Sequence, residues 1–315
     1  MNETVGWAIA RGVLISHRFL VTVTRPMGEG TMSDFVALLG VRGGPAVRPG
    51  SHMPTSNLVV MNDLTIVLDA GVGVIRGICD QGVRLIDIDV ILISHLHSDH
   101  YAELGPLIHT AWTTGLTRPL TVYGPKGLAD YWHHFQQAMM ADTALRVEDE
   151  GRVDLATLIT IVEIDEGEVF TQKGVTVTAL RNHHPPIEHS YAFRFDTGNK
   201  RLVVSGDTTF IPEMIPFAQN ADVLVHEAML TDGVEAIVNR NPNGDDRLRQ
   251  HILRSHTTAQ DAGRIATEAG VKRLALTHLV PDDLPEFTHA DWIAATRQTW
   301  DGPLDIGIDG LRIEF

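Results

Sequence analysis

The chain has 315 residues, enough for one large domain or two small ones, and its 43% hydrophobic and 21% charged residues exclude a disordered chain. Acidic residues outnumber basic ones by 40 to 25, and the resulting net charge of −15 disfavours a nucleic-acid partner. The single cysteine, Cys79, excludes an internal disulfide and a thiolate zinc cluster, and it favours a reducing compartment, which we take to be the cytoplasm.

Near its start the chain carries an apolar run, GVLISHRFLVTVT, that is too short to span a bilayer and is interrupted by His17 and Arg18. No cleavage pattern of a secretory signal follows it. We therefore interpret residues 1–33 as an N-terminal extension and residues 34–315 as one domain, with a targeting role of the extension as the alternative. No run of about 18 apolar residues occurs, which predicts a soluble protein without a membrane span.

Short runs of apolar and β-branched residues predict strands, and some segments between them have the periodicity of helices. The predicted strands are residues 35–41, 57–61, 64–71, 88–94, 120–125, 175–180, 191–195, 201–207, 221–228, 273–278 and 304–310. The predicted helices lie near residues 99–115, 126–141, 257–270 and 289–299; Thr257 or Thr258 caps the third, and Gly270 ends it. Hairpin-like strand pairs followed by alternating strands and helices predict an α/β sandwich with mixed sheets.

Four of the predicted strands end in a side chain that can bind a metal. The segments are VILIS-HLHSDH, LVVSG-D, VLV-HEA and RLALT-H. Sites in α/β sheets are built in the crevice outside the carboxyl ends of the strands, so these strand ends predict one site in one domain.

The densest of these segments is SHLHSDH, residues 94–100. Imidazole and carboxylate groups are good ligands for zinc and similar ions. Residues two apart in an extended or tightly turned segment project to the same side, so His95 and His97 can bind one ion together. Asp99 and His100 follow and can face a second ion. A set of surface or capping histidines is the alternative, and the low chance frequency of this pattern disfavours it.

This H-x-H-x-D-H loop resembles the hallmark of the metallo-β-lactamase-fold hydrolase superfamily, and the resemblance covers about residues 34–315. It implies an αβ/βα four-layer sandwich with two mixed sheets. VSGDT is similar to the superfamily's bridging-aspartate motif and implies Asp207, and LTHL is similar to its final ligand motif and implies His278.

The third histidine of the first metal lies within NHHPPIEHSYAFRF, where His183, His184 and His189 compete. In sulfatase-like and ribonuclease Z-like members the ligand precedes a strand of this kind by several residues, which favours His184, with His183 as the runner-up. The implied cofactor is a pair of zinc ions, with manganese or iron as alternatives. The implied ligands are His95, His97 and His184 for one ion, Asp99, His100 and His278 for the other, and Asp207 as the bridge.

Two such ions can hold a bridging hydroxide that attacks an ester, so no serine or cysteine nucleophile is needed, and no G-x-S-x-G elbow is present. Asp99 can orient this nucleophile or receive its proton. SHTTAQDAG resembles the H-[ST]-T-A helix of the ribonuclease Z and arylsulfatase-like branch, which implies a proton donor at His256, and Glu227 in VHEAML would orient it. The alternatives are helix capping for His256 and a structural role for Glu227 and for His226.

The resemblance implies an enzyme, a metal-dependent hydrolase that cleaves a small-molecule ester: a phosphodiester, a sulfate ester or a lactone. A class B1 β-lactamase is disfavoured because Cys79 lies upstream of the metal loop. One alternative is a ribonuclease Z-type tRNA-processing endonuclease, disfavoured because only 23 positions separate His184 from Asp207, too few for the long arm of bacterial members. The other alternative is a non-catalytic metal-binding scaffold. The chain does not distinguish a monomer from a homodimer.

Residues 229–255 have a loop-like composition, and we expect them to form a lid that sets specificity. Trp112 and Tyr101 are equally compatible with the core and with a pocket wall. Six further histidines lie outside these motifs and are interpreted as surface or partly buried residues: His17, His52, His133, His134, His251 and His289.

Overall fold

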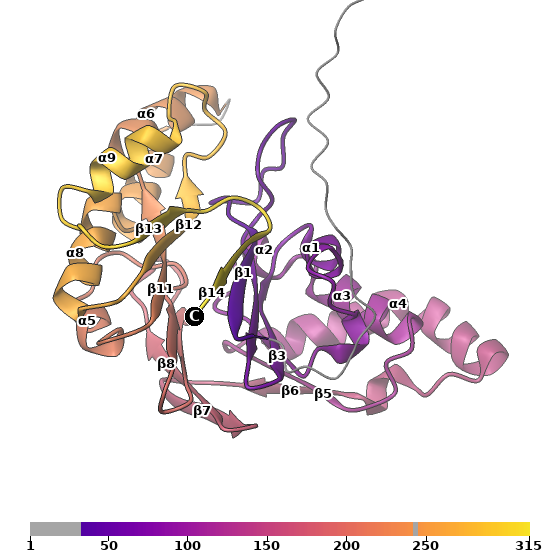
Figure 1. Cartoon of the computed structure of the whole chain (residues 1–315). Helices are drawn as coiled ribbons and strands as arrows, with labels where there is room; N and C mark the ends of the chain where they lie inside the picture. Colours follow the sequence, from indigo (N-terminus) through magenta and orange to yellow (C-terminus); the bar gives the residue numbers. More distant parts are fainter. Residues whose placement is uncertain (1–32, 242–244) are drawn as a thin grey trace, which may run out of the picture. The chain divides into compact units, whose positions relative to one another are not determined.

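Two seven-stranded sheets form the centre of the protein (Figure 1). The computed structural model describes residues 33–241 and 245–315, so the extension predicted for residues 1–33 lies outside the described residues except for Ser33. The first sheet has the order β14-β1-β2-β3-β4-β5-β6 and the second the order β13-β12-β11-β10-β9-β8-β7. The first comprises β1 (Phe35–Gly40), β2 (Ser56–Met61), β3 (Leu64–Ala70), β4 (Val90–Leu92), β5 (Leu120–Gly124), β6 (Ile159–Glu163) and β14 (Leu311–Glu314). The second comprises β7 (Gly167–Gln172), β8 (Val175–Arg181), β9 (Tyr191–Asp196), β10 (Arg201–Val204), β11 (Val223–Met229), β12 (Leu274–Val280) and β13 (Leu304–Ile306).

Both sheets are mixed, and each is antiparallel at one side and parallel at the other. In the first sheet, neighbours in the series β14, β1, β2 and β3 pair antiparallel, and neighbours in the series β3, β4, β5 and β6 pair parallel. In the second sheet, neighbours from β7 to β10 pair antiparallel, and neighbours from β10 to β13 pair parallel. The β2–β3 hairpin turns at Asn62 and Asp63, which both have positive φ, as the tight turns that match strand twist require. The parallel halves leave the carboxyl ends of several strands together at one edge of each sheet.

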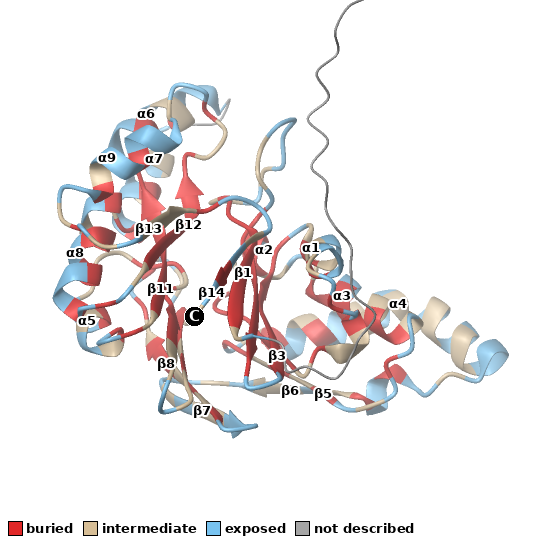
Figure 2. Ribbon diagram, in the orientation of Figure 1, coloured by how far each residue is buried: buried red, intermediate tan, exposed pale blue. Residues whose placement is uncertain are grey.

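Successive side chains of a strand point to opposite faces of its sheet, so they belong to different cores. The three cores described below lie between four layers. In β1, Phe35 and Ala37 belong to the core beneath the helices, whereas Val36 and Leu38 belong to the core between the two sheets. A third core lies between the second sheet and its own helices. Figure 2 shows buried residues along the strands and exposed residues on the outer helix faces. The predicted αβ/βα four-layer sandwich is therefore confirmed.

The helices occupy the two outer layers (Figure 1). Those associated with the first sheet are α1 (Val74–Asp80), α2 (Ser98–Tyr101), α3 (Leu104–Thr113) and α4 (Leu128–Glu150), with short 3₁₀ turns at Leu85–Asp87 and Leu155–Thr157. Those associated with the second sheet are α5 (Met214–Phe217), α6 (Thr231–Arg240), α7 (Asp246–Ser255), α8 (Ala259–Ala269) and α9 (His289–Thr296). Among residues 33–241 and 245–315, no helix is both long and apolar enough to cross a membrane.

Several predicted elements differ from those observed. The helix expected at residues 99–115 is two helices, α2 and α3, and the helix expected at residues 126–141 continues to Glu150. Strands β6, β7 and β14 were not predicted, because their side chains are only partly buried and their pattern is weak. The capping prediction at α8 is resolved in favour of Thr258, whose side chain accepts from the Asp261 N–H, and Gly270 ends the helix with φ of 63°.

The segment at residues 229–255 was predicted to be loop-like, and this prediction is wrong. It holds the end of β11 and the helices α6 and α7, with residues 242–244 outside the description. Both helices are amphipathic: α6 buries Val234 and Val238, and α7 buries Ile252. Polar residues of the two helices, such as Asp232, Asn239 and Arg247, are exposed, where they do not oppose helix formation.

Candidate dinuclear metal centre

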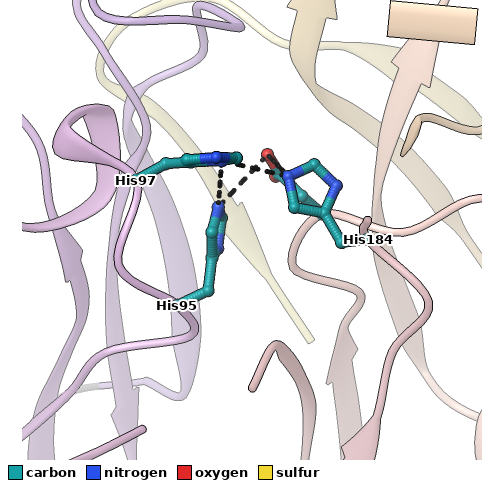
Figure 3. Close-up of side chains that lie close together, drawn as sticks. His95, His97 and His184 are labelled. Carbon is teal, nitrogen blue, oxygen red and sulfur yellow. Dashed lines mark hydrogen bonds and ion pairs between the residues drawn. The ribbon is translucent and has the colours of Figure 1, made fainter. Parts of the chain in front are cut away.

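The seven residues predicted as metal ligands come together at the carboxyl ends of strands from both sheets. His95 and His97 lie in the loop after β4, and Asp99 and His100 lie in α2 directly beyond it. The second sheet contributes His184 after β8, Asp207 after β10 and His278 from β12. Figure 3 shows the imidazole rings of His95, His97 and His184 pointing toward one another. The sequence pattern predicted one site at the strand ends, and the structure brings these residues together from both sheets.

The first ligand group consists of His95, His97, His184 and Asp207, whose ligand atoms all lie within 4.8 Å of one another. The Nδ1 atom of His97 lies 3.1 Å from Nε2 of His95 and 3.0 Å from Nε2 of His184. Nitrogen ligands of a tetrahedral zinc ion lie about 3.3 Å apart, so this spacing suits one ion. Burial lowers the pKa of His95 well below its ordinary range and that of His184 to about 3, so both rings are neutral and can donate a lone pair.

The second ligand group consists of Asp99, His100 and His278. Nε2 of His278 lies 3.0 Å from the Asp207 carboxylate and 3.3 Å from that of Asp99. Burial alone would lower the pKa of His278, but the charge of Asp207 and hydrogen bonds to both carboxylates raise it to about 10. Conversely, burial would raise the pKa of Asp207, but His100 and His278 hold it well below its usual range. Protons thus balance the buried carboxylate charge here, and a divalent cation can replace them.

Two buried polar atoms of the site have no hydrogen bond, and this bears on whether a metal fits there. Nε2 of His100 and Oδ1 of Asp207 are both buried and lack a hydrogen-bond partner among residues 33–241 and 245–315. Burying a polar group without a partner is costly unless something else satisfies it. Because the surrounding donor set is imidazole and carboxylate, the two groups fit a dinuclear metal site, with Asp207 of the first group 3.3 Å from His100 and 3.0 Å from His278 of the second.

The competing histidines near His184 face elsewhere. His183 is exposed and makes its contacts through its backbone, which bonds Thr208 and Thr209. His189 contacts the guanidinium of Arg181 at 3.2 Å. Neither belongs to a ligand group in the described part of the chain. The geometry therefore favours His184 among the three.

A hydrogen-bonded carboxylate that the sequence analysis overlooked orients two of the ligands. Asp69, at the end of β3, accepts from the backbone N–H of Ser94 at 2.7 Å and its hydroxyl at 2.9 Å, and it lies 2.8 Å from Nδ1 of His100. The Ser94 hydroxyl is also 3.1 Å from Nδ1 of His95. Such partners set which ring nitrogen is free to bind a metal. The segment LTIVLD also ends a strand with a carboxylate, so the rule that identified Asp207 would have identified Asp69.

His256 and Glu227 form a buried pair next to the second ligand group. Nδ1 of His256 lies 3.2 Å from each Glu227 oxygen, and Glu227 also accepts from the Thr208 N–H at 2.9 Å. The His256 ring stacks on His278 with centroids 5.2 Å apart, and its ligand atom groups with those of Asp207 and His278. Since Thr258 caps the N-terminus of α8, His256 does not have this role, and it lies at the C-terminal cap position of α7. Glu227 therefore holds His256 with Nε2 left for a ligand.

His226, the neighbour of Glu227, is fully buried on β11 and belongs to no ligand group in the described part of the chain. Its Nδ1 lies 2.7 Å from the backbone carbonyl of Glu227. This contact favours a structural role for His226.

A cavity of about 310 Å³ opens beside the ligands. Its walls come from the loop after β1, from α6 and α7, and from the segment after β12. Tyr101 and Trp112 do not line it: Trp112 is buried in the core and donates its indole N–H to the Val153 carbonyl, and Tyr101 packs against Tyr131. Both belong to the core beneath the helices.

The chain is similar to known proteins in sequence and in fold. Residues 36–278 match the family model described as Anti-Pycsar protein Apyc1. Ribonuclease Z of Mycobacterium bovis (strain BCG / Pasteur 1173P2) is 30% identical over 282 residues, which cover 89% of this chain and 97% of that protein. Among solved structures, the metallo-β-lactamase fold protein YhfI from Bacillus subtilis superposes with a TM-score of 0.66 and 23% identity, covering 90% of this chain and all of that one. The short form of human tRNase Z superposes with a TM-score of 0.63 and 20% identity, over 89% and 98% of the two chains.

Proposed function

This chain belongs to the ribonuclease Z branch of the metallo-β-lactamase-fold superfamily, and from that membership we propose that it is a metal-dependent hydrolase of a small-molecule phosphodiester. The observation that carries the proposal is the pair of neighbouring ligand groups beside the cavity, with Asp207 of the first group 3.0 Å from His278 of the second. The relatives are named ribonucleases, a name that denotes cleavage of a phosphodiester. A cavity of about 310 Å³ suits a small ligand, and the net charge of −15 opposes a polyanion.

The proposed ligands are the seven residues already described, and zinc is the proposed metal, with manganese or iron as alternatives. When bound, the two ions supply Lewis acidity and lower the pKa of water. The carboxylate of Asp99 is held by the Gly44 N–H at 2.9 Å and receives the proton of the attacking water. Glu227 holds His256 so that its Nε2 donates a proton to the leaving oxygen.

Ribonuclease Z activity is the second candidate, because the 30% identity to a protein of that name extends over 97% of its length. A gel assay with precursor tRNA distinguishes the two. Efficient cleavage of the tRNA together with inert small phosphodiesters would overturn our preference.

The proposal is tested on metal-loaded protein with bis(p-nitrophenyl) phosphate, p-nitrophenyl sulfate, a lactone and a chromogenic β-lactam. We expect hydrolysis of the phosphodiester, about two metal ions per chain by elemental analysis, and loss of at least about three orders of magnitude in turnover for Asp207→Ala. His133→Ala is the matched control, since His133 is exposed on α4. Unchanged turnover in Asp207→Ala would refute the dinuclear mechanism, and metal binding without hydrolysis of any substrate would favour a non-catalytic scaffold.

The roles of His256 and Glu227 are tested with two esters whose leaving groups differ in pKa. A proton donor matters most for a poorly acidic alcohol and least for p-nitrophenol. His256→Ala should therefore slow an alkyl phosphodiester more than bis(p-nitrophenyl) phosphate, and Glu227→Gln should show the same selectivity to a smaller degree. Equal losses on both esters would assign His256 a different role, such as metal binding.

A further inference from the structure

One face of helix α7 forms a wall of the cavity. Leu248, His251 and Ile252 are spaced three and four residues apart, so they share a helix face, and all three line the cavity. Ile252 is buried, and Leu248 and His251 are half-buried. An imidazole and two aliphatic side chains therefore line the same part of the cavity.

His251 faces the metal-ligand side chains across the cavity. Its ring centroid lies 5.9 Å from that of His97, 6.3 Å from that of His184 and 6.4 Å from that of His256. In the part of the chain that the structure describes, neither of its ring nitrogens has a hydrogen-bond or ion-pair partner. It also belongs to no ligand group there. Its polar atoms are therefore free for a molecule bound in the cavity.

Contacts of helix α7 with the rest of the protein fix the position of His251. The backbone carbonyl of Ser255, one turn further along α7, lies 2.8 Å from Nδ1 of His184, and the Ser255 hydroxyl donates to the Pro185 carbonyl at 2.6 Å. The guanidinium of Arg249 pairs with Glu235 of α6, with one N–H at 2.8 Å from the carboxylate. Helix α7 is thus tied directly to a proposed metal ligand and to its neighbouring helix.

We propose that His251 is a substrate-binding residue that hydrogen-bonds an oxygen of the phosphodiester group. Leu248 and Ile252 contact an apolar substituent of the same ester, so the substrate class is a phosphodiester with an apolar or aromatic group next to phosphorus. The inference rests on the proposed function, and it assigns a role to a histidine that no sequence motif marks.

The kinetic test compares His251→Ala, His251→Asn and His251→Gln with Gln250→Ala, all in metal-loaded protein. Gln250 is the neighbouring residue and is exposed, so it is the matched control for helix α7. Removal of a hydrogen bond to a charged group lowers kcat/KM or affinity by about tenfold to a hundredfold. We expect that loss in kcat/KM for bis(p-nitrophenyl) phosphate with His251→Ala, no change with Gln250→Ala, and partial recovery with Asn or Gln, which places an amide where one ring nitrogen lies.

A second readout does not depend on turnover. Calorimetry measures the binding of phenylphosphonate and of methylphosphonate to the metal-loaded proteins. We expect His251→Ala to bind phenylphosphonate about tenfold more weakly than Gln250→Ala, with equal metal content and equal thermal midpoints. We also expect the wild-type protein to bind phenylphosphonate more tightly than methylphosphonate, because of the aliphatic side chains beside His251.

The outcomes separate the two proposals. A wild-type protein that hydrolyses no phosphodiester but binds phenylphosphonate through His251 would refute the proposed function and leave this inference standing. A wild-type protein that hydrolyses phosphodiesters, with His251→Ala equal to Gln250→Ala in both assays, would overturn this inference alone. Loss of metal in His251→Ala would also overturn it, and equal affinity for the two phosphonates would refute the apolar substituent.

Discussion

Asp69 holds the proposed metal ligand His100 by a hydrogen bond, and its replacement by asparagine tests that role. The side chain is buried and accepts three hydrogen bonds: two from Ser94, at 2.7 and 2.9 Å, and one from Nδ1 of His100, at 2.8 Å. Asparagine has the same shape and tolerates the φ of 64° at this position, so the backbone is not strained. Its NH₂ group, however, cannot accept from the ring. Because the same oxygen, Oδ2, also accepts from the Ser94 hydroxyl, the substitution removes that bond together with the one that fixes His100, and it leaves the bond from the Ser94 N–H to Oδ1 in place.

The magnitude follows from the bond that is lost. With an amide NH₂ facing Nδ1, the His100 ring is driven to the tautomer that carries its proton on Nε2, the atom that faces Asp99 and Asp207 at 3.5 and 3.3 Å. A protonated nitrogen does not bind a metal. A hydrogen bond to a charged group is worth about 1.5–3 kcal/mol, which corresponds to about a tenfold to hundredfold loss of affinity.

The assay is a zinc titration of metal-free protein against a chelating indicator, followed by kcat at saturating zinc. We expect one of the two binding steps to weaken by about tenfold to a hundredfold in Asp69→Asn and to stay unchanged in Asp149→Asn, since Asp149 is exposed at the end of α4. The thermal midpoint of the metal-free proteins shows whether the variant folds. A folded Asp69→Asn with wild-type zinc affinity would refute the ligand role of His100 or its orientation by Asp69.

Three further predictions concern the same centre. His95→Ala should lower turnover by at least about three orders of magnitude while His133→Ala stays near normal in a steady-state assay, and equal effects would mean that the site lies elsewhere. Gly43→Ala should lower the thermal midpoint and the metal content, because its new Cβ would overlap Cγ2 of Val280 and lie 3.0 Å from Nδ1 of His278; a wild-type metal content would contradict the crowding of His278. His278 has a pKa of about 10 in the metal-free protein and is protonated at pH 8, so zinc binding there should release protons; calorimetric heats independent of the buffer's ionisation enthalpy would exclude this.

Much of the fold was predictable because the strands are strongly patterned. Completely buried strands such as β1, β3 and β11 are recognised by their apolar runs. The order of hairpins and alternating helices predicted a sandwich with mixed sheets, and the resemblance to the superfamily implied that there are two of them. Half-exposed strands such as β6 and β7 escaped prediction, because they pack on one side only. The sequence predicted a loop where α6 and α7 lie, because polar residues outnumber the few apolar residues that these helices bury.

Local chemistry determined by the sequence alone includes the H-x-H-x-D-H loop and the polar residues at strand ends. Their spacing places imidazoles and carboxylates on one side of a turn, and the strand ends of parallel segments meet at one sheet edge. These rules predicted that His95 and His97 act together and that Asp207 and His278 lie at the same edge, whereas His184 and the full ligand set came from the resemblance to the superfamily. The same rule would have included Asp69.

Only the tertiary structure decided which residues that are distant in the sequence lie next to the candidate metal centre and its cavity. His251 is five residues before His256 and has no motif, yet the packing of α7 against the loop of His184 turns it toward the cavity. The choice of His184 over His183 likewise depends on which side chain points inward, and Asp69 meets His100 across 31 positions of sequence. Such contacts depend on how the two sheets and their helices pack, because a side chain's neighbours across the fold are set by long-range burial and hydrogen bonding that local spacing does not encode.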